Sequence, residues 1–239
     1  MTTTIDPQMT LGELVTTRPL LARELEHHGL DYCCGGTATL QDACLSQHLD
    51  PVVVARELDA IAADDEPDTW ASMAPTQLVE HIVATHHRYL WDELPRLAAL
   101  TDKIAGVHGG RHPELIEVRD RFSELRADLE PHMSREEQVL FPMIQRLAAN
   151  DTAASLHCGT MQNPISVMLE EHERVGELLA QLRALTNGFE TPTDGCASYR
   201  ACYEGLAHLE ADTHLHVHKE NNLLFPAAIE LETRLEERP

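Results

Sequence analysis

The stretch HMSREEQVLFPMI, residues 132–144, recurs 84 residues later as HVHKENNLLFPAAI, residues 216–229. Both copies place a Glu four positions after a His, and a Phe-Pro pair five and six positions after that Glu. The chain has only 4 Phe and 13 Pro among 239 residues, so a Phe-Pro pair at a preset position arises by chance about once in a thousand. The coincidence therefore indicates an internal repeat.

Each copy also has a histidine at a matching distance upstream. His87 precedes His132 by 45 residues, and His172 precedes His216 by 44. His86 is the alternative in the first half, but its separation of 46 residues fits the repeat less well. The repeat unit therefore contains a single His followed by the His-x3-Glu motif.

Helical spacing of apolar residues predicts four long helices, separated by stretches that contain Gly or Pro. The expected ranges are residues 76–101, 114–149, 164–187 and 196–236. Four helices of about 20 to 40 residues, joined by connections of moderate length, are typical of a four-helix bundle. The low aromatic content of 4% agrees with an all-α fold rather than with a sandwich or barrel.

The repeated polar side chains are expected to face the core of this bundle. Positions i and i+4 lie on one helix face, so the His and the Glu of each motif point the same way. His172 lies on an apolar stripe with Met168 and Val175, and His87 lies on a similar stripe. Four imidazoles and two carboxylates therefore meet in one apolar interior.

A metal site explains such a set of side chains. An unpartnered buried carboxylate costs on the order of several kcal/mol, which two bound cations would offset. Imidazole nitrogen and carboxylate oxygen suit iron, manganese or zinc. Six ligands for two ions leave an open position, which a closed structural zinc site lacks. The expected metal ligands are His87, His132, Glu136, His172, His216 and Glu220.

A purely structural interpretation is the alternative. Single His/Glu pairs are common on solvated helix faces, and a lone core histidine usually needs only a hydrogen bond. The duplication of the whole set favours metal binding. Whether His86 or His108 joins the site is open, and Glu171 is expected on a solvated helix face. The histidines expected at the surface or beside the ligands are His81, His86, His108, His112, His208, His214 and His218.

The charge of the chain excludes some partners. The formal net charge is −22, which argues against binding to nucleic acid or to an anionic membrane surface. The sequence has no apolar run as long as a membrane span and no secretory signal pattern at its start. We therefore expect a cytoplasmic protein whose cysteines are mostly reduced.

The chain is expected to contain two domains. The stretch ADDEPDTWASMAP, residues 63–75, is acidic and contains proline, which is typical of a boundary. Before it, Gly29 is expected to end one short helix and Pro51 to open another. The expected domains are a small helical N-terminal domain at residues 1–64, which carries the motif DYCCGG, and the bundle at residues 76–236.

The DYCCGG motif contains the adjacent Cys33 and Cys34. Neighbouring side chains diverge, which makes a poor metal-binding pair, and adjacent Cα atoms about 3.8 Å apart are too close for a relaxed disulfide. The following glycines permit a positive φ or a close approach of another segment. We interpret the pair as exposed, reactive thiols for redox chemistry or iron transfer, and a glycine turn with bystander thiols is the alternative. The cysteines expected to be ordinary small apolar residues are Cys44, Cys158, Cys196 and Cys202.

The duplicated His…His-x3-Glu…Phe-Pro pattern resembles the hemerythrin-like (HHE) domain. The DYCCGG motif in a small helical module joined to such a domain is similar to the iron–sulfur cluster repair di-iron proteins, the repair of iron centres family. The stretches EEQVLFPMI, PISVMLEEHE and KENNLLFP fit that family's pattern as well. The resemblance covers about residues 10–230.

The resemblance implies a hemerythrin-like four-helix bundle with an internal two-fold repeat. It also implies two non-haem iron ions, in preference to manganese or zinc, with an oxo or hydroxo bridge. By position, the four repeated histidines are the terminal ligands, and Glu136 and Glu220 are the bridging ligands. The resemblance further implies a cytoplasmic homodimer that acts on iron–sulfur proteins damaged by nitric oxide or peroxide.

Three functions are compatible with these features. The first is repair of iron–sulfur clusters by supply of iron, with Cys33 and Cys34 as the handover group. The second is enzymatic: a nitric oxide reductase that forms nitrous oxide at the same di-iron site. The third is a sensor or carrier of oxygen or nitric oxide, for which the cysteine motif has no use.

Overall fold

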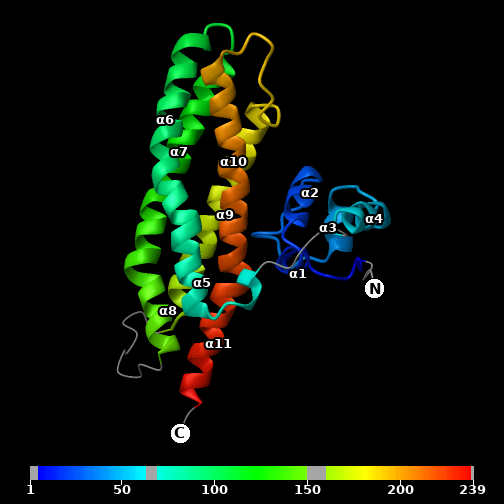
Figure 1. The fold of residues 1–239 in the computed structure, drawn as a ribbon, viewed down its shortest axis with the longest axis vertical. Helices are drawn as coiled ribbons and strands as arrows, with labels where there is room; N and C mark the ends of the chain where they lie inside the picture. The colour runs from blue at the N-terminus through cyan, green and yellow to red at the C-terminus, as the bar shows by residue number, and fades with distance from the viewer. Residues whose placement is uncertain (1–4, 63–68, 150–159, 238–239) are drawn as a thin grey trace.

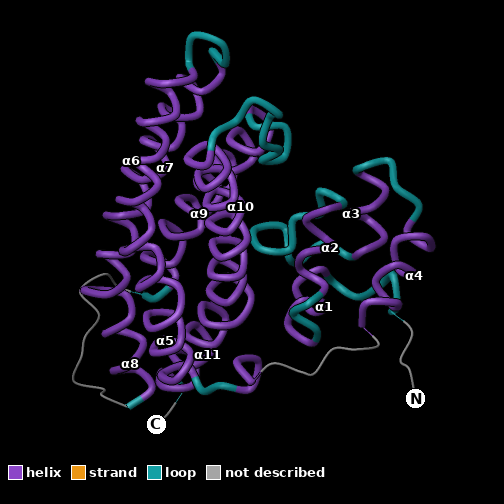
Figure 2. Tube along the Cα trace, turned by 45° about the horizontal axis from the view of Figure 1, so that its top comes forward, coloured by secondary structure: helices purple, strands orange, loops and turns teal. Residues whose placement is uncertain are grey.

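The computed structural model describes residues 5–62, 69–149 and 160–237, and within these ranges the chain is helical, with no β-strand. A tall helical bundle has a smaller cluster of short helices against one side (Figure 1). The same two parts, built of helices and loops, are seen in the tube view (Figure 2). The all-α prediction is confirmed for the described residues. None of their helices is long and apolar enough to cross a bilayer.

The N-terminal cluster consists of four short helices. Thr10 caps the first of them through reciprocal hydrogen bonds with Glu13. Gly29 follows the second with a φ of +67°, which fits the predicted helix end. Pro51 opens the fourth, as expected. The helices are α1 (Leu11–Thr17), α2 (Leu21–His27), α3 (Leu40–Ser46) and α4 (Pro51–Ala62).

One small apolar core holds these helices together. Leu11, Leu25, Leu40 and Leu58 come from the four helices, and each is at most 1% exposed. Val217 of the bundle packs into the same cluster. A bundle residue thus completes the core of the N-terminal helices and ties them to the bundle.

Four rods form the bundle, in agreement with the predicted pattern. Three of them contain a π-helical turn, in which the backbone accommodates one extra residue. The rods are α5–η2–α6 (Pro75–Ile82, Val83–His87, Arg88–His108), α7–η3–α8 (Glu114–Arg135, Glu136–Leu140, Phe141–Ala148), α9 (Gln162–Leu185) and α10–η4–α11 (Ala197–Lys219, Glu220–Leu224, Phe225–Glu236). A short 3-10 helix, η1 (Thr69–Ser72), precedes the first rod.

The first rod is longer than the sequence pattern predicts. It continues past the expected end near residue 101 as far as His108, because Ile104 and His108 remain buried on the same face. The chain turns only at Gly109. Residues 63–68 of the expected boundary lie outside the described ranges, as does Cys158.

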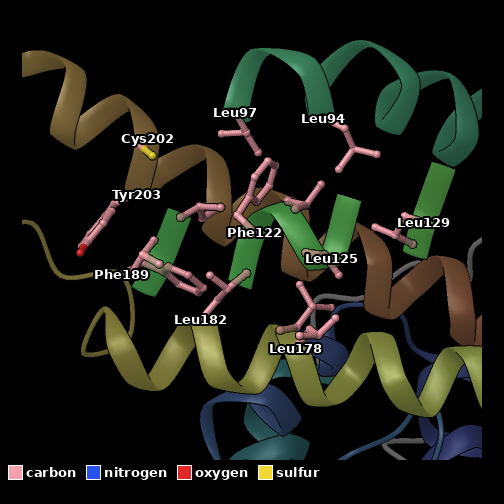
Figure 3. Packing of buried hydrophobic residues seen from close by; sticks show 14 of the residues in the cluster. Leu94, Leu97, Phe122, Leu125, Leu129, Leu178, Leu182, Phe189, Cys202 and Tyr203 are labelled. Carbon is pink, nitrogen blue, oxygen red and sulfur yellow. The ribbon is translucent and has the colours of Figure 1, made fainter. Parts of the chain in front are cut away.

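Two apolar clusters fill the bundle. In the first, Leu97, Phe122, Leu182 and Tyr203 converge from α6, α7, α9 and α10 (Figure 3). The second gathers around Phe141 near the other end of the rods. Along each rod, the repeated His and Glu residues lie where the positions of one cluster give way to those of the other. The apolar clusters therefore enclose a polar layer.

The π-helical turns coincide with the repeated motifs. Both η3 and η4 begin at the Glu of the motif and end just before the Phe-Pro pair. Proline has no N–H and crowds the carbonyl four residues before it, so a regular α-helix accommodates it poorly. The π-turn absorbs this misfit, which explains the fixed distance from Glu to Phe-Pro. Such turns are frequent at functional sites.

Candidate metal centre

The structure brings the six predicted ligand side chains together in the polar layer of the bundle. They form two groups of four, and within each group one donor atom from every residue lies within 4.8 Å of the others. All six are buried. Each group defines one candidate ion position. His87 and His216 flank the first position, His132 and His172 flank the second, and Glu136 and Glu220 belong to both. Each position therefore takes one histidine from each half of the repeat.

Three of the four imidazoles are oriented by an acceptor on their outer nitrogen. His87 Nδ1 lies 2.9 Å from Glu137 Oε1, and His132 Nδ1 lies 2.8 Å from Glu171 Oε2. His172 Nδ1 lies 2.7 Å from the amide oxygen of Asn221. Because these oxygens accept, each Nδ1 carries a proton, and whenever the ring is neutral its Nε2 lone pair points inward. Metal-binding histidines have this arrangement.

The inward nitrogens face one another in pairs. Nε2 of His87 lies 3.1 Å from Nε2 of His216, and the same distance separates Nε2 of His132 from Nε2 of His172. Two lone pairs so close repel, so a proton or a metal ion must lie between them. Two nitrogens bound to one ion at about 2.1 Å, at angles between 90° and tetrahedral, would lie about 3.0 to 3.4 Å apart. The observed separation fits a shared ion.

The two buried carboxylates lack most of the partners that their oxygens require, and metal ions would supply those partners. Both oxygens of Glu136, and Oε2 of Glu220, have no hydrogen-bond partner among the described residues. The nearest imidazole nitrogens lie 3.2 to 3.4 Å away without hydrogen-bond geometry. Burial alone would raise the pKa of Glu136, but the facing His132 and His87 hold it below the usual value. Of the four carboxylate oxygens only Oε1 of Glu220 has a hydrogen-bond partner among the described residues, since it lies 3.1 Å from Nε2 of His216. Ionised carboxylates with unpartnered oxygens in an apolar core fit a cation site.

Protons compete with metal ions for this centre. Burial lowers the pKa of His132, but the carboxylates of Glu136 and Glu171 outweigh burial and raise that pKa to about 10. Without a metal, the imidazole therefore carries the charge that the buried carboxylates require. Metal uptake must displace that proton.

The fourth imidazole, His216, is held differently. Its Nδ1 has no hydrogen-bond partner among the described residues, and His86 stacks on the ring with centroids 5.5 Å apart. His86 is engaged elsewhere, since Nδ1 lies 2.9 Å from Asp212 and Nε2 lies 2.8 Å from Lys219 Nζ. His86 therefore flanks the centre and is outside both donor groups.

The Phe of each repeated motif also has a place in the site. Phe141 stacks on His87 with ring centroids 5.5 Å apart, and Phe225 stacks on His172 at 6.0 Å. Each Phe thus covers the histidine of its own half of the repeat. The stacking excludes water from one face of the imidazole and fixes its orientation.

Glu171 has a different role from the one the sequence suggests. It is half-buried, accepts the Nδ1 proton of His132 and also pairs with Arg135. These contacts, led by the hydrogen bond from His132, lower the pKa of Glu171 to about 2. The expectation of a simply solvated side chain is therefore wrong, and Glu171 is a carboxylate that orients His132.

The cysteine motif forms a tight loop around Asp31. Its Oδ1 accepts hydrogen bonds from the backbone N–H groups of Cys33 (3.0 Å) and Cys34 (2.9 Å), and its Oδ2 accepts from that of Gly35 (3.0 Å). This turn brings the two Sγ atoms to 3.9 Å from each other, so the prediction that adjacent side chains diverge is wrong.

The two thiols also differ in exposure. Cys34 is half-buried, but Cys33 is only 7% exposed, so the prediction of two exposed thiols is wrong for Cys33. The hydrogen bond with Cys34, burial and the carboxylate of Asp31 raise the pKa of the Cys33 thiol well above its usual value. Cys33 is therefore a protonated thiol near neutral pH unless a cation replaces the proton.

The glycines of the motif do not adopt a positive φ, and Gly36 instead allows the loop to pack closely against Asn222. Only Gly29 and Gly188 have a positive φ among the described glycines, so that interpretation of Gly35 and Gly36 is wrong. A Cβ on Gly36 would lie less than 3.0 Å from the side-chain oxygen of Asn222. The second predicted reason, close approach of another segment, therefore holds at Gly36.

One side chain connects this loop to the metal centre. Asn221, which accepts the Nδ1 proton of His172, donates through Nδ2 to the carbonyl of Cys33 at 3.3 Å. Asn222 donates to the same carbonyl at 3.1 Å. The N-terminal loop therefore docks on the bundle of its own chain, directly outside the donor group that contains His132 and His172.

Cys196 departs from the prediction of an ordinary apolar residue. It is exposed at the far end of the bundle, and its Sγ lies 3.2 Å from Nε2 of the buried His108. This hydrogen bond lowers the pKa of Cys196 to about 7. Cys44 and Cys202 are buried, as expected. His108 thus belongs to a cysteine pair remote from the metal ligands.

Cys196 should be alkylated by iodoacetamide with a pH profile centred near 7, because the thiolate is the reactive form and its pKa is lowered. His108→Phe keeps the ring packed on Tyr199 but removes the hydrogen bond, so the midpoint should rise toward 9. Mass spectrometry of the modified peptide measures the rate. Val107→Ala, at an exposed neighbouring position, should leave the profile unchanged. An unshifted midpoint in His108→Phe would contradict the assignment.

Comparison with known proteins agrees with this geometry. The family model described as hemerythrin HHE cation binding domain matches residues 78–228, more than half of the chain. This chain belongs to the hemerythrin HHE family. A second model, ScdA_N, described as a domain of unknown function, matches residues 7–62 of this hemerythrin HHE protein. The prediction of a hemerythrin-like helical bundle is confirmed.

Curated relatives match nearly the whole length of this hemerythrin HHE protein. It is 36% identical to the iron-sulfur cluster repair protein YtfE of Edwardsiella ictaluri (strain 93-146), over 92% of this chain and 96% of the relative. It is 35% identical to YtfE of Cronobacter sakazakii (92% and 95%) and 32% identical to a probable iron-sulfur cluster repair protein of Haemophilus influenzae (93% and 97%). The resemblance to the iron–sulfur cluster repair family is confirmed.

Proposed function

We propose that this protein repairs iron–sulfur clusters damaged by nitrosative or oxidative stress, and that it does so by supplying iron from a dinuclear centre. The observation that carries this proposal is a pair of donor groups that share two buried carboxylates, three of whose four oxygens have no hydrogen-bond partner among the described residues. The relatives named as iron–sulfur cluster repair proteins support the same function. The proposed cofactor is two non-haem iron ions with an oxo or hydroxo bridge.

The six buried side chains would hold both ions with incomplete coordination. Each position has two imidazoles and two shared carboxylates, which are fewer protein donors than the six that iron commonly accepts. When bound, the iron pair supplies exchangeable ferrous ions. Glu137, Glu171 and Asn221 hold the Nδ1 protons outward, so the Nε2 lone pairs stay directed at the ions.

The proposal assigns separate roles to two domains. Residues 76–236 form the di-iron bundle, and residues 1–64 form a small domain that presents the cysteine loop beside it. The hydrogen bonds from Asn221 and Asn222 to the Cys33 carbonyl support this arrangement, because they hold the loop beside the second ion position. Cys33 and Cys34 are proposed as the groups that take over iron.

Iron supply is tested by mixing the reduced, iron-loaded protein with an iron–sulfur enzyme that has lost iron from its cluster. A ferrous chelator too large to enter the protein captures any iron released into solution. We expect recovery of client activity together with loss of iron from this protein. An enzyme that stays inactive here, but recovers when ferrous ion is added without the chelator, would contradict the proposal.

Nitric oxide reduction at the same centre is the second candidate. Two ions that share both carboxylates could bind two nitric oxide molecules side by side. The balanced reaction takes two nitric oxide molecules, two electrons and two protons to one nitrous oxide and one water. Gas chromatography of the fully reduced protein under nitric oxide decides between the two functions. Nitrous oxide formed without client repair would favour the enzyme.

The proposal extends to partners and location. Damaged iron–sulfur proteins are the clients, and nitric oxide and oxygen are the small ligands, with an oxygen or nitric oxide sensor as a further alternative. A homodimer is expected from the family resemblance, so sedimentation should give twice the chain mass of 26.7 kDa. A cytoplasmic location agrees with the five free cysteines of the described residues.

A further inference from the structure

The cysteine loop gathers a second set of metal-binding atoms outside the bundle. One carboxylate oxygen of Asp31 and the Sγ atoms of Cys33 and Cys34 all lie within 4.8 Å of one another. Asp31 Oδ1 is 3.1 Å from the Sγ of Cys33, which in turn is 3.9 Å from that of Cys34. Asp31 is exposed, so the group is open on one side.

These distances suit donors bound to one metal ion at angles between 90° and the tetrahedral value. A divalent ion such as zinc binds thiolate at about 2.3 Å, so two sulfurs at tetrahedral angles lie about 3.8 Å apart. A carboxylate oxygen bound at about 2.1 Å lies about 3.1 Å from such a sulfur when the bonds meet at a right angle. Both estimates agree with the observed separations. Three donors leave a fourth coordination position free.

The open side of the group faces a cavity with negative walls. The cavity has a volume of about 470 Å³ and lies between the cysteine loop and helices α9 and α10. Five carboxylates line it, including Glu173 and Glu177, against one guanidinium (Arg183) and one imidazole (His214). Such a cavity concentrates cations near the loop.

The loop is also adjacent to the proposed iron store. Asn221 touches both His172 and the carbonyl of Cys33, so a single amide side chain separates the loop backbone from a ligand of the second ion position. An ion that leaves the bundle on this side therefore meets the cysteine loop directly.

We propose that Asp31, Cys33 and Cys34 form a separate, three-donor site for a ferrous ion, at which iron pauses between the di-iron centre and the client. This inference rests on the proposed supply of iron, and it adds Asp31 as the third donor that makes the two cysteines a defined metal site. The free fourth position accepts a thiolate of the client, which then displaces the three donors.

Transfer through this site needs no redox partner. The ion remains ferrous throughout, so no electron is added or removed. The thiols of Cys33 and Cys34 lose their protons to solvent when the ion binds, and regain protons when it leaves. Metal–sulfur bonds to the loop break as those to the client form.

Cobalt(II) is a direct probe, because only a thiolate-bound ion gives an intense sulfur-to-cobalt charge-transfer absorption. The reduced protein, already loaded with iron in the bundle, is titrated with cobalt(II). We expect one additional equivalent to bind with this absorption while the iron content is unchanged. The proposed bundle ligands include no thiolate, so they cannot produce the signal. A wild-type protein without the absorption would overturn the site.

Two loop variants and one control variant assign the signal to the loop. Cys34→Ser should lower the affinity for cobalt(II) at least about tenfold and weaken the absorption. Cys196→Ser, the matched change at another accessible cysteine, should leave both unchanged. Asp31→Asn removes one ligand charge and should also weaken binding. An absorption and an affinity that are both unchanged in Cys34→Ser, or an absorption that disappears in Cys196→Ser, would place the ion elsewhere.

The handover is separated from iron supply as a whole by comparing variants in the client assay. If the inference is correct, Cys34→Ser retains two bundle irons but transfers them to the client more slowly than the wild type. If the wild type binds cobalt(II) at the loop but never restores the client, the transfer site stands and the proposed function fails. If Cys34→Ser restores the client as fast as the wild type, iron supply stands and the transfer site fails.

Discussion

Replacing Glu136 with Gln should empty both metal positions at once. Glu136 belongs to both donor groups, and Gln keeps its size but removes the charge that balances the ions. We expect the metal content to fall from two ions per chain to none after dialysis against a chelator, with affinity reduced by about two orders of magnitude or more. Metal analysis of the purified variant measures the loss.

Two further variants make this result specific. His132→Gln removes a donor from the second position only, so it should retain about one ion per chain. Glu170→Gln makes the same change at an exposed position two residues before His172, and it should retain both ions. If Glu136→Gln kept one tightly bound ion, the two positions would not share this carboxylate, and the dinuclear arrangement would be wrong.

Replacing Gly36 with Ala should detach the cysteine loop from the bundle. The added Cβ would lie less than 3.0 Å from the side-chain oxygen of Asn222 and from the carbonyl of Tyr32, so the backbone must shift. Overpacking of this kind costs about 1 to 3 kcal/mol. We expect faster alkylation of Cys33 and Cys34, measured by mass spectrometry, with two ions still bound in the bundle.

The control for this experiment is Gly106→Ala. Gly106 lies inside α6, and a Cβ there would meet no atom within 4 Å. Alanine favours a helix interior over glycine by about 1 kcal/mol, so the variant should be at least as stable as the wild type and alkylate at the same rate. Unchanged alkylation in Gly36→Ala would show that the loop does not depend on this close packing.

The bundle and the set of candidate ligands could be predicted from the sequence because both occur in an internal repeat. The spacing of the repeat favoured His87 over the adjacent His86 by a difference of one residue. The structure places only His87 among the donor groups. Phe141 and Phe225 were visible as a repeated motif, but their stacking on the histidines depends on the π-helical turns. Helical periodicity at 3.6 residues carries no signal for such a turn.

The groups that orient the histidines could have been found by the same repeat. Glu137 and Asn221 are 84 residues apart, like the two motifs, and each accepts the Nδ1 proton of the single histidine in its half. Comparison of those two positions in the sequence would have predicted that both side chains accept a hydrogen bond from a ligand histidine. Glu171 is harder to find, because its counterpart is His86, which stacks on His216 instead of accepting a proton.

The cysteine loop was not predictable in the same way. The two Sγ atoms converge because Asp31 accepts three backbone hydrogen bonds and curls the loop. The docking of that loop depends on Asn222, which is about 190 residues away in the sequence. A single sequence contains no signal for a contact of that range unless a repeat or a motif marks both ends.

The central claim is that two ions lie between the facing histidines and share both glutamates. Anomalous diffraction at the iron absorption edge, from crystals of the iron-loaded protein, tests it most directly. The account predicts two peaks within the bundle, one beside Nε2 of His87 and His216 and one beside Nε2 of His132 and His172, each within bonding distance of both carboxylates. A single peak, or carboxylates that contact no metal, would contradict it.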